Sequence, residues 1–587
     1  MRGRENPVGR ALAMVLVAAS IQAEIARSAS EEERNDRAAA ATSPEPSGGK
    51  QPTGVRAHRV WSDASGKDKI EAALVDAAQG KVRLKKAHGQ VIVVALEKLS
   101  KADQDYINRW AALRKEHPWL DTNAPFDVVK FLEPIANMEN AALLYADALF
   151  EFSADATDLL PPEEQERRRP FARKRAAEHR RLDEAWGKDP KSVNPAEMDA
   201  WLAEYESGFR KLALAQQRPR CAFPCPVSFF WLSGHVHAAR EVARVLAWRS
   251  RRDLARGDFE RPIQGVEMVL RLSRDIRHRG DSICQLVSVA LDGMCCDTMV
   301  REILLAPGLR REHCDRLLAA LARHEAEAVD PFLESQRVEY LRTRKLLWDY
   351  QHRTDVFDMK TLKDKYGAEG PLVFPFASLS LMWALQGTGD GHRLAREKLR
   401  LLREADVPGK RPAKSAEFAR RVMSMTTEDL AEEVEVVNRV FAAILGSRGM
   451  TLLQRSRACD DPKVVEPLRE TCVAVFFEPQ EFVTISKVCL REETILRGTL
   501  CLVALRRWQL DHREPPKDLD TLVKAAGVKG VPIDPYCDQP LRTTVLEDVS
   551  VVYSVGPDGK DDGARTVWDF NPSHPGDIVF RLEPPRR

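Results

Sequence analysis

Five aspartates lie close together near the end of the chain, among glycines that permit tight turns. Calcium binds six to eight oxygen ligands, and carboxylates supply them well. An EF-hand is excluded, because Lys560 occupies the third position of such a loop and Val551–Val555 is typical of a strand. The segment therefore predicts either a calcium loop or an acidic turn without a metal. The five residues are Asp558, Asp561, Asp562, Asp569 and Asp577.

A basic cluster lies nearer the N-terminus. The alternation of side chains along a strand places Lys81, Arg83 and Lys85 on one face, above the apolar Val82 and Leu84 on the other. An acidic peptide residue would find partners on this cationic strip, each exposed pair contributing about 0.2–1 kcal/mol. Alternatively, the strip is a solvated edge that discourages strand pairing. The peptide-binding candidates are Lys69, Lys81, Arg83, Lys85 and Lys86.

Other candidates for catalysis or metal binding fail on spacing. His324 lacks the second histidine, four residues on, of a zinc protease helix. His235 and His237 are two apart and lie on different faces of a helix. No nucleophile signature surrounds Cys221, and the basic run Arg167–Arg175 is typical of the solvated face of a helix. The sequence therefore predicts no catalytic residue.

Composition favours a folded protein of several domains. The 587 residues are 44% hydrophobic and 30% charged, as in ordinary folded proteins. The net charge of +2 gives the protein no overall electrostatic field of one sign, so nucleic-acid binding is not expected. The eleven cysteines are scattered and match no zinc motif. We expect mostly buried thiols, with a local bridge between Cys221 and Cys225 left open.

The N-terminus resembles a secretory leader. Arginines precede an apolar run, and small residues follow, so residues 1–28 are predicted to be a signal peptide. This predicts an exported protein, periplasmic, extracellular or of the cell envelope; the alternative is an amphipathic leader on a cytosolic protein. Residues 29–54 are predicted to be a disordered linker. No later stretch reaches 18 consecutive apolar residues, so no integral membrane span is expected.

The hydrophobic period changes along the chain. Residues 55–110 alternate β-branched and polar residues between glycines, which predicts short antiparallel strands closing into a small β-barrel. Residues 115–480 have the helical period and predict a helical-hairpin domain, with a turn at Gly257–Phe259 and loops at about 355–414. Packed stripes are predicted from one helix (Val242, Val245, Leu246, Leu254) and from the next (Ile263, Val266, Leu270), like an irregular tetratricopeptide hairpin.

Residues 55–110 resemble the SLA homology domain one (SHD) family. The resemblance implies an SH3-like barrel that binds proteins without chemistry of its own. In fungal adaptors such domains bind Asn-Pro-Phe peptides followed by an Asp, and the family is associated with cytoskeletal protein binding, ubiquitin binding and identical protein binding. The matching features are Arg59, Trp61, Asp63, Gly66, Ile70–Ala72, Gly80–Leu84, Lys86, Gly89, Lys98–Ser100 and Tyr106.

Residues 481–587 resemble the soluble part of type II secretion pseudopilins. This implies a helix packed on a small antiparallel sheet and a calcium loop, in which Asp558 and Asp577 correspond to ligands and carbonyls near Val555 complete the shell. The chain departs from the family at Pro575 and Gly576, where closely spaced acids are usual. The matching features are Ala504, Leu505, Asp511, Pro515, Pro516, Leu519, Leu522, Val531, Pro532, Asp534–Tyr536, Pro540, Leu541 and Tyr553–Gly559.

The sequence as a whole predicts a multidomain α+β protein. It would have a small SH3-like β-barrel on the N-terminal side, a mostly α-helical central domain and a small α+β pilin-like domain at the C-terminus. The leading hypothesis is a non-enzymatic adaptor or scaffold protein of the cell envelope, which binds a protein or peptide through the barrel and is capable of self-association. The alternatives are a metal-dependent envelope enzyme, in which Asp558 or Asp577 holds a metal that activates water, and a component of a secretion-like assembly.

Overall fold

The computed structural model describes most of the folded chain. It covers residues 58–120, 124–153, 194–225, 234–352, 426–461, 480–547, 549–567 and 575–582, with individual positions between 163 and 185 and position 467. The chain divides into two compact units. The first comprises residues 1–126, 343–446 and 458–484, and the second comprises 127–342, 447–457 and 485–587. The predicted leader, the linker and the loops at about 355–414 lie outside the described residues.

The first unit contains the predicted N-terminal sheet. Four antiparallel strands pair in chain order, and β4 is an edge strand. A bulge between Leu74 and Asp76 shifts the register of β2 on β3, and a bridge pairs Asp63 with Leu99. The strands are β1 (Arg59–Ser62), β2 (Lys69–Ala78), β3 (Lys81–Lys86) and β4 (Val91–Ala95), followed by the short helix η1 (Leu96–Lys98).

Helices follow the sheet in the first unit. Helix α2 (Lys101–Glu116) begins at Ser100, whose side chain accepts a hydrogen bond from the Asp103 amide. Helix α19 (Thr427–Leu445) begins with a capping box between Thr426 and Asp429. Each cap satisfies backbone donors that the first turn of a helix leaves without a partner.

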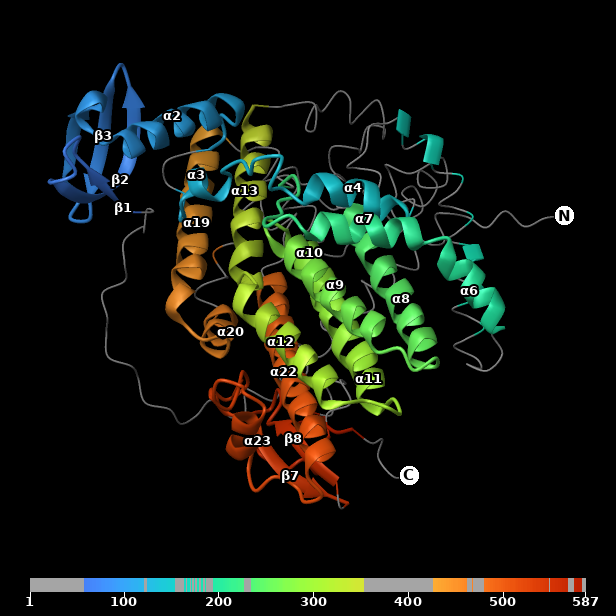
Figure 1. The fold of residues 1–587 in the computed structure, drawn as a ribbon. Helices are drawn as coiled ribbons and strands as arrows, with labels where there is room; N and C mark the ends of the chain where they lie inside the picture. The colour runs from blue at the N-terminus through green and yellow to red at the C-terminus, as the bar shows by residue number, and fades with distance from the viewer. Residues whose placement is uncertain are drawn as a thin grey trace, which may run out of the picture. The chain divides into compact units, whose positions relative to one another are not determined.

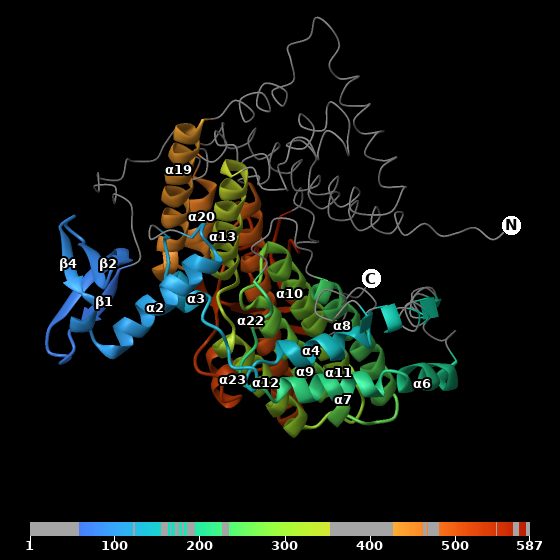
Figure 2. The same cartoon turned by 90° about the horizontal axis from the view of Figure 1, so that it is seen from above.

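The second unit is built mainly from helices (Figure 1, Figure 2). The central helices pack on one another in pairs, α8 on α9, α9 on α10 and α9 on α12. The chain continues from α10 into α11 through the π-helical turn η2 (Cys295–Val300). The described helices that lie wholly or partly in this unit are α3 (Val128–Phe131), α4 (Ala142–Phe150), α6 (Pro195–Ala203), α7 (Glu206–Gln216), α8 (Gly234–Leu254), α9 (Glu260–Arg277), α10 (Ser282–Met294), α11 (Arg301–Leu305), α12 (Arg311–Glu327), α13 (Pro331–Gln351), η5 (Gly446–Gly449), α20 (Leu452–Asp460), α22 (Gln480–Asp511) and α23 (Leu519–Ala525). Of these, α13, η5, α20 and α22 each cross a boundary between the units.

Two packed helices lie on either side of the turn predicted at Gly257–Phe259, whereas the likeness to a tetratricopeptide hairpin is not confirmed. Helices α8 and α9 pack together around a turn in which Gly257 has a φ of 76°, a conformation that glycine adopts without strain. The predicted stripe residues Val242, Val245, Leu246, Ile263, Val266 and Leu270 are all buried, and Leu254 packs against them at the end of α8.

The C-terminal part of the second unit combines the long helix α22 with small sheets. A two-stranded sheet pairs β5 (Ile533–Asp534) with β6 (Gln539–Pro540), and a three-stranded sheet has the order β7 (Arg542–Leu546), β8 (Val549–Ser554), β9 (Ile578–Phe580). Residues of α22 and of these strands belong to the same buried core as α8, α9 and α12. The α+β character is as expected, whereas the likeness to pilins is not confirmed.

Two further expectations concern cysteines and membrane spans. Cys221 and Cys225 are free thiols, so the local bridge that the sequence left open is not formed. Eight of the ten described cysteines are buried, as predicted. One described segment, Ser282–Leu305, is long and apolar enough to cross a membrane; 56% of its most apolar window is buried, and a core helix passes the same test.

Candidate functional site

A buried aromatic and ionic cluster fixes the sheet of the first unit to α2. Trp61 is 1% exposed, donates from Nε1 to the Ala72 carbonyl at 2.9 Å and makes an edge contact with Tyr106. The Arg59 guanidinium lies 4.1 Å from the centre of the Tyr106 ring. Arg59 donates to Asp103 at 2.5 Å, and Asp103 also accepts from the Ser62 amide. These residues, which carry part of the family resemblance, therefore position the sheet.

The outer surface of β3 and β4 presents the predicted cationic strip. Val82 and Leu84 are fully buried, while Lys81 and Arg83 are exposed and Lys85 is half-buried, as strand alternation requires. In the register of β3 on β4, Arg83 lies opposite Val93 and Lys85 opposite Val91. These valines are 60% and 43% exposed. We call this surface the β3–β4 face; it consists of Lys81, Arg83, Lys85, Val91 and Val93.

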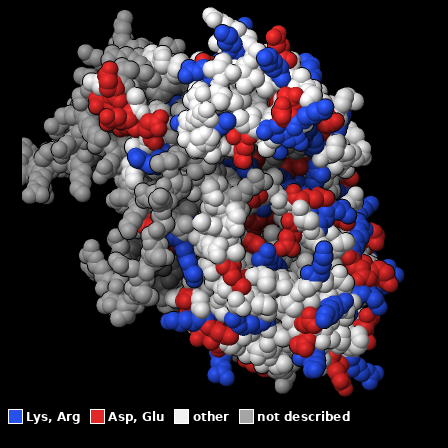
Figure 3. Space-filling model, turned by 90° about the vertical axis from the view of Figure 1, so that its left-hand side faces the viewer, with Lys and Arg blue, Asp and Glu red and all other residues white. Residues whose placement is uncertain are grey.

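The other two basic candidates lie apart from this face. Lys86 has the opposite strand parity and pairs with the buried Ala72. Lys69 is exposed at the start of β2, where it pairs with Ser62 of β1 rather than with β3. On the molecular face drawn in Figure 3, basic and acidic side chains of the described residues are interspersed. Charge-driven binding would therefore act through a local group of side chains, such as the three on β3.

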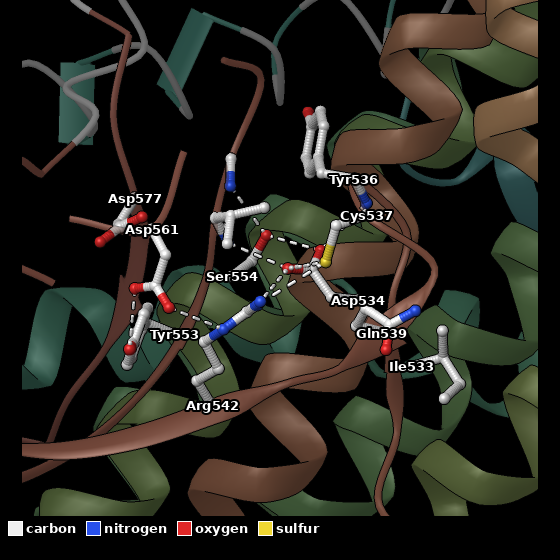
Figure 4. Close-up of polar contacts among 12 residues, drawn as sticks. Ile533, Asp534, Tyr536, Cys537, Gln539, Arg542, Tyr553, Ser554, Asp561 and Asp577 are labelled. Carbon is white, nitrogen blue, oxygen red and sulfur yellow. Dashed lines mark hydrogen bonds and ion pairs between the residues drawn. The ribbon is translucent and has the colours of Figure 1, made fainter. Parts of the chain in front are cut away.

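In the C-terminal part, the fully buried carboxylate of Asp534 joins the two small sheets. It accepts hydrogen bonds from the Tyr536 amide at 3.0 Å, the Ser554 hydroxyl at 2.8 Å and the Val555 amide at 2.9 Å (Figure 4). Asp561 accepts from the Tyr553 hydroxyl and pairs with Arg542 at 3.0 Å. The structure therefore assigns Asp534 and Asp561 to holding β5, β7 and β8 together.

The two predicted calcium ligands differ in their surroundings. Asp558 is half-buried in the turn after β8, and its Oδ1 accepts from the Lys560 amide at 3.1 Å. Asp577 is fully buried; its Oδ2 accepts from the Ala564 amide at 2.6 Å, and its Oδ1 has no hydrogen-bond partner among the residues that the structure describes. Burial raises the pKa of the Asp577 carboxyl, and the neighbouring Asp561 and Asp562 raise it further. An unpartnered carboxylate oxygen near further acids is where a cation would be held.

A second group of potential metal ligands is buried among four helices. The ligand atoms of Asp292 (α10), His324 (α12) and Glu492 (α22) lie within 4.8 Å of one another. However, Arg277 of α9 donates from Nη2 to both carboxylates. Its guanidinium already supplies the positive charge and uses an oxygen of each acid, so these residues do not fit a metal ion. We call Arg277, Asp292, His324 and Glu492 the Arg277 network.

The proton balance of this network follows from its contacts. Burial acts to raise the pKa of Asp292, but His324 and Arg277 outweigh it and hold that pKa well below its usual range. Burial raises the pKa of Glu492 to about 8; Asp292 adds to the rise, and Arg277 opposes it. One proton is therefore held on Glu492 beside an ionised Asp292.

Sequence reasoning missed this network. His324 was considered only for a partner on its own helix, whereas its partners are 32 positions away at Asp292 and on α22 at Glu492. No local spacing signals a contact between residues so far apart. By contrast, the β3–β4 face follows from strand alternation alone.

Comparison with known proteins supports the family resemblance of the N-terminal region. Residues 50–114 match the model of the SLA1 homology domain 1 (SHD1) family. Over 51 residues the chain is 49% identical to the actin cytoskeleton-regulatory complex protein SLA1 of the yeast Vanderwaltozyma polyspora and 43% identical to that of Candida albicans. This region is 9% of the chain and only 4% of the length of either relative. No solved structure matches the chain.

These similarities contradict the predicted location. The matched relatives are named for the actin cytoskeleton, so the prediction of an exported protein, periplasmic, extracellular or of the cell envelope, is wrong. The signal peptide and the pseudopilin likeness are supported by no comparison. The similarity points to a protein-binding domain of an adaptor family rather than to an enzyme.

Proposed function

We propose, from the match of residues 50–114 to the SHD1 family, that the chain is a protein-binding adaptor whose β3–β4 face binds an extended acidic peptide. The observation that carries this proposal is the pairing of two exposed valines with basic side chains in one register. Carboxylates of the peptide would pair with Lys81, Arg83 and Lys85, and its apolar side chains would cover Val91 and Val93. The named role of the relatives suggests that the partner belongs to the actin cytoskeleton.

The energetics favour a weak and reversible interaction. Exposed ion pairs contribute about 0.2–1 kcal/mol each and are screened by salt. Removal of exposed apolar surface from water adds about 25 cal/mol per Å². Because β4 is an edge strand, an extended peptide could also pair with its backbone. Lys69 and Lys86 would contribute less, since their register places them off this face.

Titration of the full chain with a labelled peptide tests the proposal. The probe is a fluorescent peptide with Asn-Pro-Phe followed by Asp, and a matched probe carries Asn in place of the Asp. We expect Arg83→Glu to weaken binding of the acidic probe by about fivefold to tenfold, equivalent to about 1–1.4 kcal/mol. Val93→Asp should also weaken it. Lys67→Glu, at an exposed lysine between β1 and β2, is the control. Equal binding by all variants would refute the assignment of this face.

A second proposal concerns calcium at the Asp577 loop. It is supported by the buried Oδ1 of Asp577, which finds no hydrogen-bond partner in the described part of the chain, and by the acids that raise the pKa of Asp577. Asp558 and nearby backbone carbonyls would supply further oxygens. Calorimetric titration of the full chain with calcium should show a heat of binding that Asp577→Asn removes. Asp538→Asn, at a half-buried acid next to β6, should retain it. Absence of binding by the unaltered chain would leave an acidic turn without a metal.

A further inference from the structure

The Arg277 network joins α22 to three other helices of the second unit. Arg277, Asp292, His324 and Glu492 are 0–3% exposed, and they come from α9, α10, α12 and α22 in turn. Arg277 bonds to Asp292 and to Glu492, which is 215 positions away. Since charges away from water are stable only when they are paired, the protonation of this network affects how firmly α22 is held.

Two acidic side chains share one arginine in this network. The ligand atoms of Asp292 and Glu492 lie within 4.8 Å of each other, and both carboxyl groups accept a hydrogen bond from Arg277 Nη2. Two carboxyl groups that share a buried site cannot both ionise freely, because like charges at close range repel, so one of them keeps its proton to higher pH. His324 places Nδ1 at 3.1 Å from the Leu270 carbonyl and Nε2 at 3.2 Å from Asp292.

Other ionisable groups face the network. On α9, Arg274 lies 3.4 Å from His324 Nδ1 and pairs with Glu327 of α12. On α22, Cys489 is close to Glu492, and Cys295 and Cys296 of η2 are close to Asp292. Burial raises the pKa of all three thiols, so they stay neutral. Arg277 therefore contacts both Asp292 and Glu492 at close range, and His324 contacts Asp292 as well.

We propose that the Arg277 network is a proton-linked latch, which holds α22 against α9, α10 and α12 most firmly in acid and loosens as the pH rises toward alkaline values. Loss of the proton places two carboxylates against each other in a fully buried site with Arg277 between them. The C-terminal half of α22 remains attached by contacts that do not involve this proton. These are Arg497 with Glu325 at 2.9 Å, Arg507 with Asp315, and Arg506 with the Leu304 carbonyl at 3.0 Å.

The direction of the pH effect follows from linkage. An exposed Glu492 in an opened state has the ordinary pKa of 4.5, whereas in the closed state it is raised to about 8. The closed state therefore binds the proton more tightly than the opened state does. The resulting stabilisation of the closed state is complete below pH 4.5 and is lost as the pH rises to about 8. The opening constant of α22 should rise by about tenfold per pH unit between about pH 5 and 8 and then level off.

Hydrogen exchange of the full chain, followed by mass spectrometry and corrected for the intrinsic exchange rate, measures this opening. Peptides from residues 485–500 should show the rise in the unaltered protein. In Glu492→Gln, which keeps a neutral side chain, they should show no change with pH. Glu325→Gln is the control, because it removes the exposed pair between Glu325 of α12 and Arg497 of α22, outside the Arg277 network. This variant should retain the full pH dependence of exchange.

Two results would overturn the latch. One is an opening constant of residues 485–500 that does not change between pH 5 and 8 in the unaltered protein. The other is a pH dependence of the opening constant in Glu492→Gln that equals the one in the unaltered protein. If Glu492→Gln does not fold, Asp292→Asn decides the matter. This substitution removes the negative charge that raises the Glu492 pKa, so the pH at which the opening constant levels off must decrease. An unchanged levelling-off pH would refute the proposal.

Discussion

Arg59 and Asp103 are hydrogen-bonded at 2.5 Å across 44 positions of the sequence, and this pair joins β1 to α2. Asp103 is 2% exposed and also accepts from the Ser62 amide and the Ser100 hydroxyl. Three donors from two segments, β1 and the residue that caps α2, therefore converge on one carboxylate. The sheet that carries the β3–β4 face depends on this convergence for its attachment to the helix.

Asp103→Ala should destabilise the first unit. It leaves three donors without their acceptor, which costs about 2–4 kcal/mol when the groups are buried. Asp105→Ala, two positions along α2, removes an exposed pair with Lys101 and should change stability by less than about 0.5 kcal/mol. Chemical denaturation followed by Trp fluorescence measures both, and equal effects would contradict the structural role of Asp103.

Gly498 should be required where α22 meets β9. A Cβ atom at this position would lie 2.2 Å from the Phe580 ring, so Gly498→Ala should destabilise the second unit by about 1–3 kcal/mol through overpacking. Gly293→Ala in α10 meets no atom within 4 Å and should stabilise by about 0.5–1 kcal/mol, because alanine favours helix. Urea midpoints of the two variants should therefore shift in opposite directions.

Gly556 should tolerate alanine less well than Gly559. Both have positive φ values, of 64° and 66°, so each substitution costs about 1 kcal/mol of backbone strain. At Gly556 the new Cβ would also lie 2.0 Å from the Gly576 carbonyl oxygen, whereas at Gly559 it meets nothing within 4 Å. Gly556→Ala should be the less stable variant by about 1–2 kcal/mol in chemical denaturation, and a smaller loss than in Gly559→Ala would be inconsistent with this close approach.

His235 should make the protein sensitive to acid. Burial lowers its pKa from 6.5 to about 4, and its ring stacks on Phe223. The unfolded chain therefore binds a proton on His235 more readily than the folded chain does. The contribution of neutral His235 to the free energy of unfolding is complete above pH 6.5 and is lost, by about 3 kcal/mol in all, as the pH falls toward 4.

His235→Leu tests this pH dependence. The variant should lose less stability than the unaltered protein between pH 7 and 4, as measured by urea denaturation at each pH. His88→Gln, at an exposed histidine between β3 and β4, is the control and should follow the unaltered protein. A parallel loss of stability in His235→Leu would show that other groups cause the acid sensitivity.

Local regularities were the part of the structure that could be predicted. Strand alternation places Lys81, Arg83 and Lys85 above the buried Val82 and Leu84, and helical spacing predicts the packed stripes of α8 and α9, because both periods are properties of the backbone. The SHD1 resemblance depends on a short contiguous segment and is likewise visible in sequence. The expected location was wrong because it rested on the composition of a leader rather than on any folded element.

Contacts between distant residues were decided by the tertiary structure. Val91 and Val93 join the basic side chains only through the register of β4 on β3. Asp577 becomes a buried acid with an unpartnered oxygen only when its loop folds against Ala564. Arg277, Asp292, His324 and Glu492 meet because four helices bring them together, and no sequence period encodes a contact across 215 positions. The sequence by itself determined which face of each element is apolar, whereas the pairing of buried charges depended on the packing of those faces.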